Sequence, residues 1–350
     1  MGGLYAFPIE YLNKMIKRFI DLISSQFYFI LLLRHNFVCR RRLLLPLYKS
    51  KVIDGYCDLN DRIVIYMVQP ETTFSGGLSD RLRGITSIYA ECKRLNLPFR
   101  IVFEPFQLQN YLLPNQYDWQ INPKNVCWNT KKVYPCTILT YNNNLHNRAQ
   151  FYAQKSLLNY YLKKRYKQIH IFSNMAIADK EFSVLFKELF RPSERLQKQI
   201  QYHLTQLGGA RKYISLTFRF RQLLGDFKEG GNILPELERE AYVKKCIKGV
   251  EALHSAYPHE SILVTSDSET FLERLAFLDY VYIIPGTVVH MGFTFDANQD
   301  TYMKSFVDYF MLSNAKKVFQ MTDKLLFRSG FPQRAAMLND APYEEIRLKV

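Results

Sequence analysis

Two arginines stand directly after a strand that the sequence predicts over residues 213–218, an apolar and β-branched run. Arg219 and Arg221 leave its carboxyl end, the edge at which doubly wound sheets bind ligands. A guanidinium there can hold a pyrophosphate through two parallel hydrogen bonds and stabilise it as a leaving group. Asp226 and Glu229 follow shortly after, and either can act as general base for an acceptor hydroxyl. The alternative is a surface Arg–Asp pair that contributes little.

A second candidate site is the pair Gly76-Gly77, which follows a strand predicted over residues 62–68. Two glycines let the backbone approach a ligand closely, and the helix that follows offers free N–H groups to an anion. Arg81 and Arg83 add positive charge. The pattern is neither G-x-G-x-x-G nor a P-loop, so a tight strand–helix turn with solvated arginines remains the alternative.

Two further polar segments follow predicted strands. Asp267 lies in Thr265-Ser-Asp-Ser268, where a polar side chain can bind a ligand. Ser266 or Ser268 is equally suited to cap the next helix.

The other segment, Arg328-Ser329-Gly330, precedes a helix opened by Pro332, and free N–H groups there can hold a phosphate. On the preceding predicted helix, Asp308 can pair with two donors of a guanine edge or support this loop.

Strands and helices alternate along most of the chain, which indicates doubly wound parallel sheets in two halves with a ligand cleft between them. Residues 105–150 are rich in Asn, Gln, Pro and Tyr and are expected to form loops and short strands. The predicted strands cover residues 62–68, 99–103, 169–172, 213–218, 261–265, 281–284 and 317–321, and the main predicted helices cover residues 82–95, 149–166, 182–207, 240–257, 269–278, 302–313 and 332–338.

Positive charge is concentrated at the N-terminus. The chain has 47 Lys and Arg against 32 Asp and Glu, a net charge of +15 that implies an anionic partner. Residues 1–55 hold nine of these basic residues and three acidic ones. The apolar stretch of residues 19–33 is shorter than the about 20 residues of a spanning helix. It predicts a helix lying on an anionic membrane surface, with a helix packed on the body as the alternative.

Six cysteines without a C-x-x-C pair indicate reduced thiols and a cytoplasmic protein. With the basic N-terminal segment, this predicts a protein that is peripheral at the inner face of the membrane. A bridge between Cys127 and Cys136 is the alternative for an exported chain. The scattered histidines show no metal-ligand spacing, so no metal is expected.

Taken together, three of these segments resemble the motifs of the fucosyltransferase superfamily. Gly76-Gly-Leu-Ser-Asp-Arg81 resembles G-G-L-G-N-[QR], and Thr217-Phe-Arg219 with Gly225-Asp226 resembles H-x-R-R-G-D. Residues 308–313 followed by residues 327–331 resemble its C-terminal block. The resemblance covers about residues 61–345. Over this range the chain is similar to α1,2-, α1,6- and protein O-fucosyltransferases, especially bacterial surface-polysaccharide enzymes.

The resemblance implies a GT-B fold and an inverting, metal-independent transfer from GDP-fucose to a glycan acceptor of a cell-surface polysaccharide. Arg219 would hold the β-phosphate of GDP, and Asp308 would lie beside the guanine. Ser329, Gly330 and Phe331 would line the nucleotide site, while Gly76, Gly77 and Asp80 would face the cleft from the acceptor side. Thr217 stands where the motif has His, and residues 222–224 are extra, so the general base stays open among Asp226, Glu229 and Asp80.

The predicted organisation is a basic amphipathic N-terminal segment (1–55), an acceptor-side Rossmann-like domain (56–205) and a nucleotide-sugar-binding Rossmann-like domain (206–350). One alternative keeps the fold with another nucleotide sugar as donor. The other is a non-catalytic basic protein that binds a membrane or nucleic acid. Residues 160–166, the one run that interleaves aromatic and basic side chains, fit a helix face better, so no nucleic-acid partner is expected.

Overall fold

The computed structural model describes residues 9–52, 62–70, 76–104, 106–139, 147–176, 179–227, 229, 231–291, 298 and 300–348. The chain divides into two compact units. Unit 1 comprises Met1–Phe74, Arg83–Val102 and Gln120–Asp179, and unit 2 comprises Ser75–Leu82, Phe103–Trp119 and Lys180–Val350. Unit 2 therefore includes segments that the sequence placed in residues 56–205, and the domain boundaries themselves stay a prediction.

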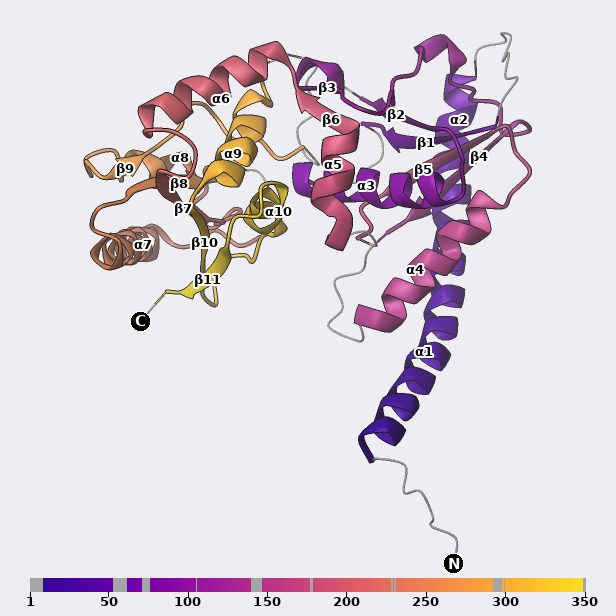
Figure 1. Ribbon diagram of the computed structural model, residues 1–350, viewed down its shortest axis with the longest axis horizontal. Helices are drawn as coiled ribbons and strands as arrows, with labels where there is room; N and C mark the ends of the chain where they lie inside the picture. Colours follow the sequence, from indigo (N-terminus) through magenta and orange to yellow (C-terminus); the bar gives the residue numbers. More distant parts are fainter. Residues whose placement is uncertain are drawn as a thin grey trace, which may run out of the picture. The chain divides into compact units, whose positions relative to one another are not determined.

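Unit 1 is built on a four-stranded sheet in the order β2-β1-β5-β4 (Figure 1). β5 pairs in parallel with both β1 and β4. The strands are β1 (Ile63–Val68), β2 (Phe99–Phe103), β4 (Val133–Ile138) and β5 (Gln168–Ser173), and the helices that follow β1 and β4 are α3 (Leu78–Arg94) and α4 (Asn147–Leu162).

β4 lies in a region that the sequence predicted as loops and short strands. The run contains Pro135, which argues against a strand because proline cannot donate to a ladder. β4 is an edge strand that pairs on one side only, so the proline is tolerated there.

The N-terminal segment belongs to unit 1, where it packs against α4 and β4. α1 (Ile9–Cys39), a π-helical turn (Arg40–Leu44) and α2 (Leu45–Lys51) follow one another, and α1 runs alongside α4 (Figure 1). Asn36 Nδ2 donates to the Thr137 carbonyl at 2.5 Å, and the Tyr48 hydroxyl lies 2.6 Å from His170 Nδ1. One helix, Ile20–Lys51, is long and apolar enough to cross a membrane by length and composition.

Unit 2 is built on a five-stranded sheet in the order β11-β10-β7-β8-β9, with parallel pairing throughout. The strands are β7 (Tyr213–Phe218), β8 (Ser261–Ser266), β9 (Val281–Tyr282), β10 (Lys317–Thr322) and β11 (Tyr343–Arg347). From β7 the chain builds β8 and β9 on one side, then β10 and β11 on the other. The strand order therefore reverses at β7, and ligands bind parallel sheets at such a switch point.

Three helices of this sheet are close to the predicted ones, while the helix that begins at Glu269 ends at Glu273, short of the predicted residue 278. The helices are α7 (Glu236–Ala256), α8 (Glu269–Glu273), α9 (Met303–Asn314) and α10 (Gly330–Leu338). The core of unit 2 contains apolar side chains from the strands and from the helices. They include Leu216, Val264 and Phe319 from the strands and Cys246 and Phe271 from the helices.

The predicted helix over residues 182–207 is interrupted. α5 (Phe182–Leu189) ends before a short strand β6 (Phe190–Pro192), which pairs antiparallel with β3 (Leu112–Pro114), and α6 (Glu194–Gln206) begins after it. Ser193 caps α6, accepting a hydrogen bond from the Leu196 N–H. Pro192 explains the break, because the residue before a proline avoids the helical region.

The cysteines differ in part from the prediction of reduced thiols. Cys127 is disulfide-bonded, while Cys39, Cys92, Cys136 and Cys246 are free and buried. The alternative bridge between Cys127 and Cys136 is therefore wrong. The predicted α/β class with two parallel sheets is confirmed, and both sheets are consistent with a GT-B fold.

Candidate active site

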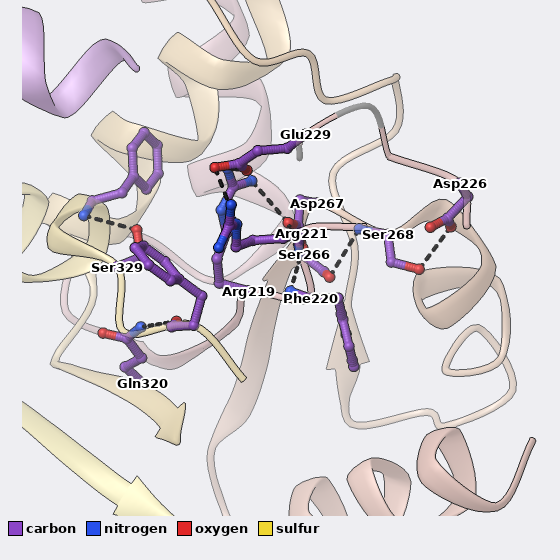
Figure 2. Close-up of polar contacts among 12 residues, drawn as sticks. Arg219, Phe220, Arg221, Asp226, Glu229, Ser266, Asp267, Ser268, Gln320 and Ser329 are labelled. Atoms are coloured by element: carbon purple, nitrogen blue, oxygen red, sulfur yellow. Dashed lines mark hydrogen bonds and ion pairs between the residues drawn. The ribbon is translucent and has the colours of Figure 1, made fainter. Parts of the chain in front are cut away.

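Arg219 lies where the prediction placed it, directly after β7 at the point where strand order reverses (Figure 2). Its Nη1 donates to Asp267 Oδ2 at 2.8 Å, and its Nη2 donates to Glu229 Oε2. The guanidinium carbon lies 4.7 Å from the centre of the Phe227 ring. Contacts on three sides fix the direction of this side chain, which is 16% exposed.

Asp267 is the residue that orients Arg219. It follows β8, and its carboxylate accepts hydrogen bonds from the N–H groups of Phe220 and Arg221 at 2.8 and 2.7 Å. Burial raises the pKa of the Asp267 carboxyl, against the opposing effect of the Arg219 charge. The sequence predicted that Asp267 binds a ligand. In the structure its carboxylate oxygens instead accept the N–H groups of the turn after β7.

Arg221 and Arg219 both contact the carboxylate of Glu229. The Arg221 Nε lies 3.3 Å from Glu229 Oε1, and the Arg221 guanidinium carbon lies 5.1 Å from the Phe327 ring centre. Arg221 has a φ of 55°, a left-handed conformation that non-glycine residues rarely adopt. Glu229 thus bridges the two arginines, in a position where an anionic ligand would meet them.

Asp226 is placed elsewhere. Its Oδ2 accepts hydrogen bonds from Ser268 Oγ at 2.7 Å and from the Thr270 N–H at 2.9 Å, so it caps the start of α8 (Figure 2). Ser268 is itself the N-cap residue of α8, as one reading of the sequence expected. Of the carboxylates near the arginines, Glu229 and Asp267 contact Arg219 and Asp226 does not.

The glycine turn belongs to unit 2 and meets the same region. Arg81 donates to the carbonyls of Gly76 at 2.9 Å and Met291 at 2.6 Å, and its side chain is buried. A Cβ at Gly77 would lie 3.5 Å from His290 Nε2. Arg81, which the sequence predicted to add charge for an anion, therefore links the glycine turn to Met291. The glycine turn lies next to His290.

His290 was not predicted, because an isolated histidine in a loop carries no motif. Its ring centre lies 6.4 Å from that of Phe227, the ring that also contacts Arg219. Burial, followed by the charges of Arg219, Arg81 and Arg221, lowers the pKa of His290 from 6.5 to about 3.

The C-terminal motif approaches this cluster through its backbone. The Phe327 N–H donates to the Arg219 carbonyl at 2.9 Å, and Ser79 Oγ donates to the Gly330 carbonyl at 3.2 Å. Ser329 caps α10, its hydroxyl accepting from the Phe331 N–H at 3.2 Å. The segment of residues 327–330 thus contacts both the glycine turn and the Arg219 loop within unit 2.

Other predicted residues have separate partners. Arg328 pairs with Glu345 at 2.6 Å on the surface, and the Phe331 ring lies 5.1 Å from that of Tyr309. Asp308 is buried on α9, where Lys304 Nζ lies 2.9 Å from each of its carboxylate oxygens. Burial raises the pKa of the Asp308 carboxyl, although the Lys304 charge opposes this.

Two residues of α3 complete the predicted set. Asp80 lies in the first turn of α3, with its carboxylate against Gly76. Arg83 belongs to unit 1, where its Nε donates to the Asn174 carbonyl at 2.6 Å. Within the described part of the chain, no group of three or more His, Cys, Asp or Glu side chains is arranged to hold a metal ion.

Fold and site define an α/β protein with two arginines, paired with carboxylates, at the switch point of a parallel sheet. In comparisons with solved structures, the chain is similar to Arabidopsis thaliana FUT1, a variant in complex with GDP. The TM-score is 0.50 at 12% identity, over 91% of this chain and 79% of that one. At this identity the likeness shows the fold alone: the chain has the fold of this plant protein.

Two weaker likenesses involve the fucosyltransferase NodZ from Bradyrhizobium, with a TM-score of 0.49 and 13% identity over 80% of this chain and 92% of that one. NodZ alpha-1,6-fucosyltransferase soaked with GDP-fucose gives 0.48 and 12% over 80% and 93%. No protein-family model matches the sequence, and no curated protein sequence matches it.

Proposed function

We propose that this protein is an inverting glycosyltransferase that transfers fucose from GDP-fucose to a glycan acceptor in cell-surface polysaccharide biosynthesis. The observation that carries the proposal is Arg219, held by Asp267 at the switch point of the unit 2 sheet. The fold supports it, since the plant protein with this fold was solved with GDP. The three sequence motifs that resemble fucosyltransferases approach one another in unit 2, which supports it further.

The proposed reaction needs little covalent work from the protein. The acceptor hydroxyl attacks the anomeric carbon opposite the departing GDP, and its proton passes to a carboxylate. Arg219 and Arg221 bind the diphosphate and stabilise the charge that develops on it, the largest contribution expected in such transfers. Glu229 and Asp80 are the carboxylates kept as candidates for the base, because Asp226 is engaged at the start of α8.

The donor is tested by nucleotide release across a panel of GDP- and UDP-sugars with a mixed glycan acceptor. GDP release from GDP-fucose alone supports the proposal, whereas release from another sugar nucleotide assigns that donor to the same site. Arg219→Ala should reduce turnover at least 100-fold, since one such donor contributes 10²–10³ to kcat. Arg274→Ala removes an arginine of an exposed pair with Glu240 and serves as the control. Unchanged turnover in Arg219→Ala would contradict the assignment.

We also propose that α1 binds an anionic membrane surface. Its buried side chains include the polar Asp21, Ser25 and Asn36, while most of its exposed side chains are apolar. The exposed apolar side chains are Ile20, Leu22, Ile23, Phe27, Ile30, Leu31, Phe37 and Val38. Burying such a face against acyl chains is favourable, and the exposed Arg41, Arg42 and Lys49 beyond it suit anionic head groups.

Vesicle flotation tests this surface. Phosphatidylcholine vesicles that contain phosphatidylglycerol should carry the protein, with less binding at high salt. A triple variant Ile23→Ser, Phe27→Ser and Ile30→Ser should stay in solution, while Leu237→Ser, at an exposed leucine of α7, should behave as wild type. Equal flotation of the triple variant would rule out this face.

The side of the membrane is a separate question. We propose the cytoplasmic face, as the sequence predicted, although the disulfide at Cys127 is more typical of an oxidising compartment. Protease added to sealed, inside-out membrane vesicles should digest the chain if it lies on the cytoplasmic face. Protection in these vesicles, with digestion of right-side-out ones, would place it on the other side.

A further inference from the structure

His290 lies on the segment between β9 and α9 and packs near Phe227, the ring that contacts Arg219 of the proposed diphosphate site. Its neighbours are the Gly77 backbone and the Phe227 ring, and Phe227 carries the Arg219 guanidinium on its face. Arg81 ties the adjacent residue, Met291, to the glycine turn, which holds His290 and Met291 next to that turn.

The charges around His290 come from every loop of this site. Arg81, Arg219 and Arg221 are positive and act on its imidazole. Two carboxylates lie on the arginines themselves, Glu229 on both Arg219 and Arg221 and Asp267 on Arg219. Among the described residues of the glycine turn, Asp80 is a further charged group, with its carboxylate against Gly76. Without a ligand, burial and then the three arginine charges keep the pKa of His290 at about 3, so the imidazole is neutral at pH 7.

We infer that His290 takes up a proton from solvent when a sugar nucleotide binds at Arg219 and Arg221, and that the resulting imidazolium stabilises the diphosphate as leaving group. This inference rests on the proposed function only in requiring a diphosphate ligand. The proton adds to the unprotonated ring nitrogen, and it returns to solvent when the nucleoside diphosphate leaves.

The size of the effect follows from Coulomb attraction. A negative charge about 6 Å from the imidazole raises its pKa by about 2 at an effective dielectric constant of about 20. Two diphosphate charges therefore bring the pKa of His290 from about 3 to near neutrality. The charges that act on the imidazole are those of the three arginines, so displacement of Glu229 from Arg219 and Arg221 changes the pKa of His290 less than the diphosphate itself does.

Calorimetry of the full chain tests the proton uptake directly. GDP-fucose is the probe, because its diphosphate is doubly esterified and does not itself titrate near pH 6.5. Binding is measured in buffers of different ionisation enthalpy, and the slope gives the protons taken up. Wild type should take up between one half and one proton at pH 6.5, and His290→Asn none. His259→Asn, at an exposed histidine before β8, should match wild type.

A second measurement needs no variant. The imidazole ¹⁵N resonances of wild-type protein should show His290 neutral without ligand and protonated with GDP-fucose at pH 6.5. Binding without proton uptake, or a His290 ring that stays neutral in the complex, would overturn the inference while leaving the proposed function intact. If GDP-fucose fails to bind, UDP-glucose and GDP-mannose replace it; a chain that binds none of them contradicts both.

Discussion

Asp267 holds Arg219 from the neighbouring strand: Oδ2 lies 2.8 Å from Arg219 Nη1, and the same carboxylate accepts the N–H groups of Phe220 and Arg221. One buried group thus fixes both the guanidinium and the backbone turn that carries it. The residues come from the ends of β7 and β8, which pair in parallel, so the sheet itself sets their separation.

Replacing Asp267 should therefore impair donor binding more than an ordinary carboxylate change. In Asp267→Asn one terminal group becomes an N–H donor facing donors, which leaves buried groups unpaired at a cost of about 1–3 kcal/mol. We expect the KM for the donor to rise at least tenfold and the unfolding midpoint to fall. Asp279→Asn, at an exposed position before β9, is the control. A wild-type KM in Asp267→Asn would show that Arg219 does not depend on this carboxylate.

Glu229 should compete with the donor for the two arginines. Its carboxylate contacts Arg219 and Arg221 in the absence of ligand, so an incoming diphosphate must displace it. Glu229→Gln should lower the Kd for GDP by up to about fivefold, which corresponds to the about 0.2–1 kcal/mol of a partly exposed ion pair. Glu240→Gln, which removes the carboxylate of a surface pair with Arg274, controls for net charge. Weaker GDP binding in Glu229→Gln would reverse the argument, and an accompanying loss of kcat would assign Glu229 as the base.

The strands around this site were predictable because their residues form continuous apolar runs between turn signals. Arg219, Ser329 and the glycine turn could likewise be placed, since each follows a strand or opens a helix. The side chains that these residues contact could not be predicted from the sequence. The sequence placed Asp226 close to Arg219 and gave Asp267 a ligand, yet only the fold decides that Asp226 caps α8 while Asp267 contacts Arg219.

Other features escaped the sequence for similar reasons. β11 alternates exposed and half-buried positions on an edge and has no apolar run. His290 gains its meaning from charges on three distant segments. The polarity of α1 was visible as composition, but which of its faces is buried depends on its packing against α4 and β4.

Lys304 and Asp308 form a buried ion pair one turn apart on α9, each about 5% exposed or less. Removing one partner leaves an uncompensated buried charge, so Lys304→Met should lower the free energy of unfolding by about 3–5 kcal/mol. The double variant Lys304→Met, Asp308→Leu should recover much of this loss, because an apolar pair needs no desolvation of charge. Urea unfolding of the three proteins checks the order. Equal destabilisation of single and double variants would show that packing, and not charge, dominates. GDP affinity of the double variant separately tests whether Asp308 reads the guanine.

His170 predicts how the stability of unit 1 depends on pH. It is fully buried between the Tyr48 hydroxyl, 2.6 Å from Nδ1, and Gln168 Oε1, 2.8 Å from Nε2, and burial lowers its pKa to about 3. Because the unfolded chain has the ordinary pKa of 6.5, it binds the proton more readily than the folded chain between pH 6.5 and 3. Stability is therefore complete above pH 6.5 and falls as the pH drops, by up to about 1.4 kcal/mol per pH unit for this histidine. Urea unfolding between pH 7.5 and 5, followed by Trp128 fluorescence, measures the slope. His170→Gln should be less stable at pH 7.5 but flatter with pH, and an unchanged slope would show that His170 is not the titrating group.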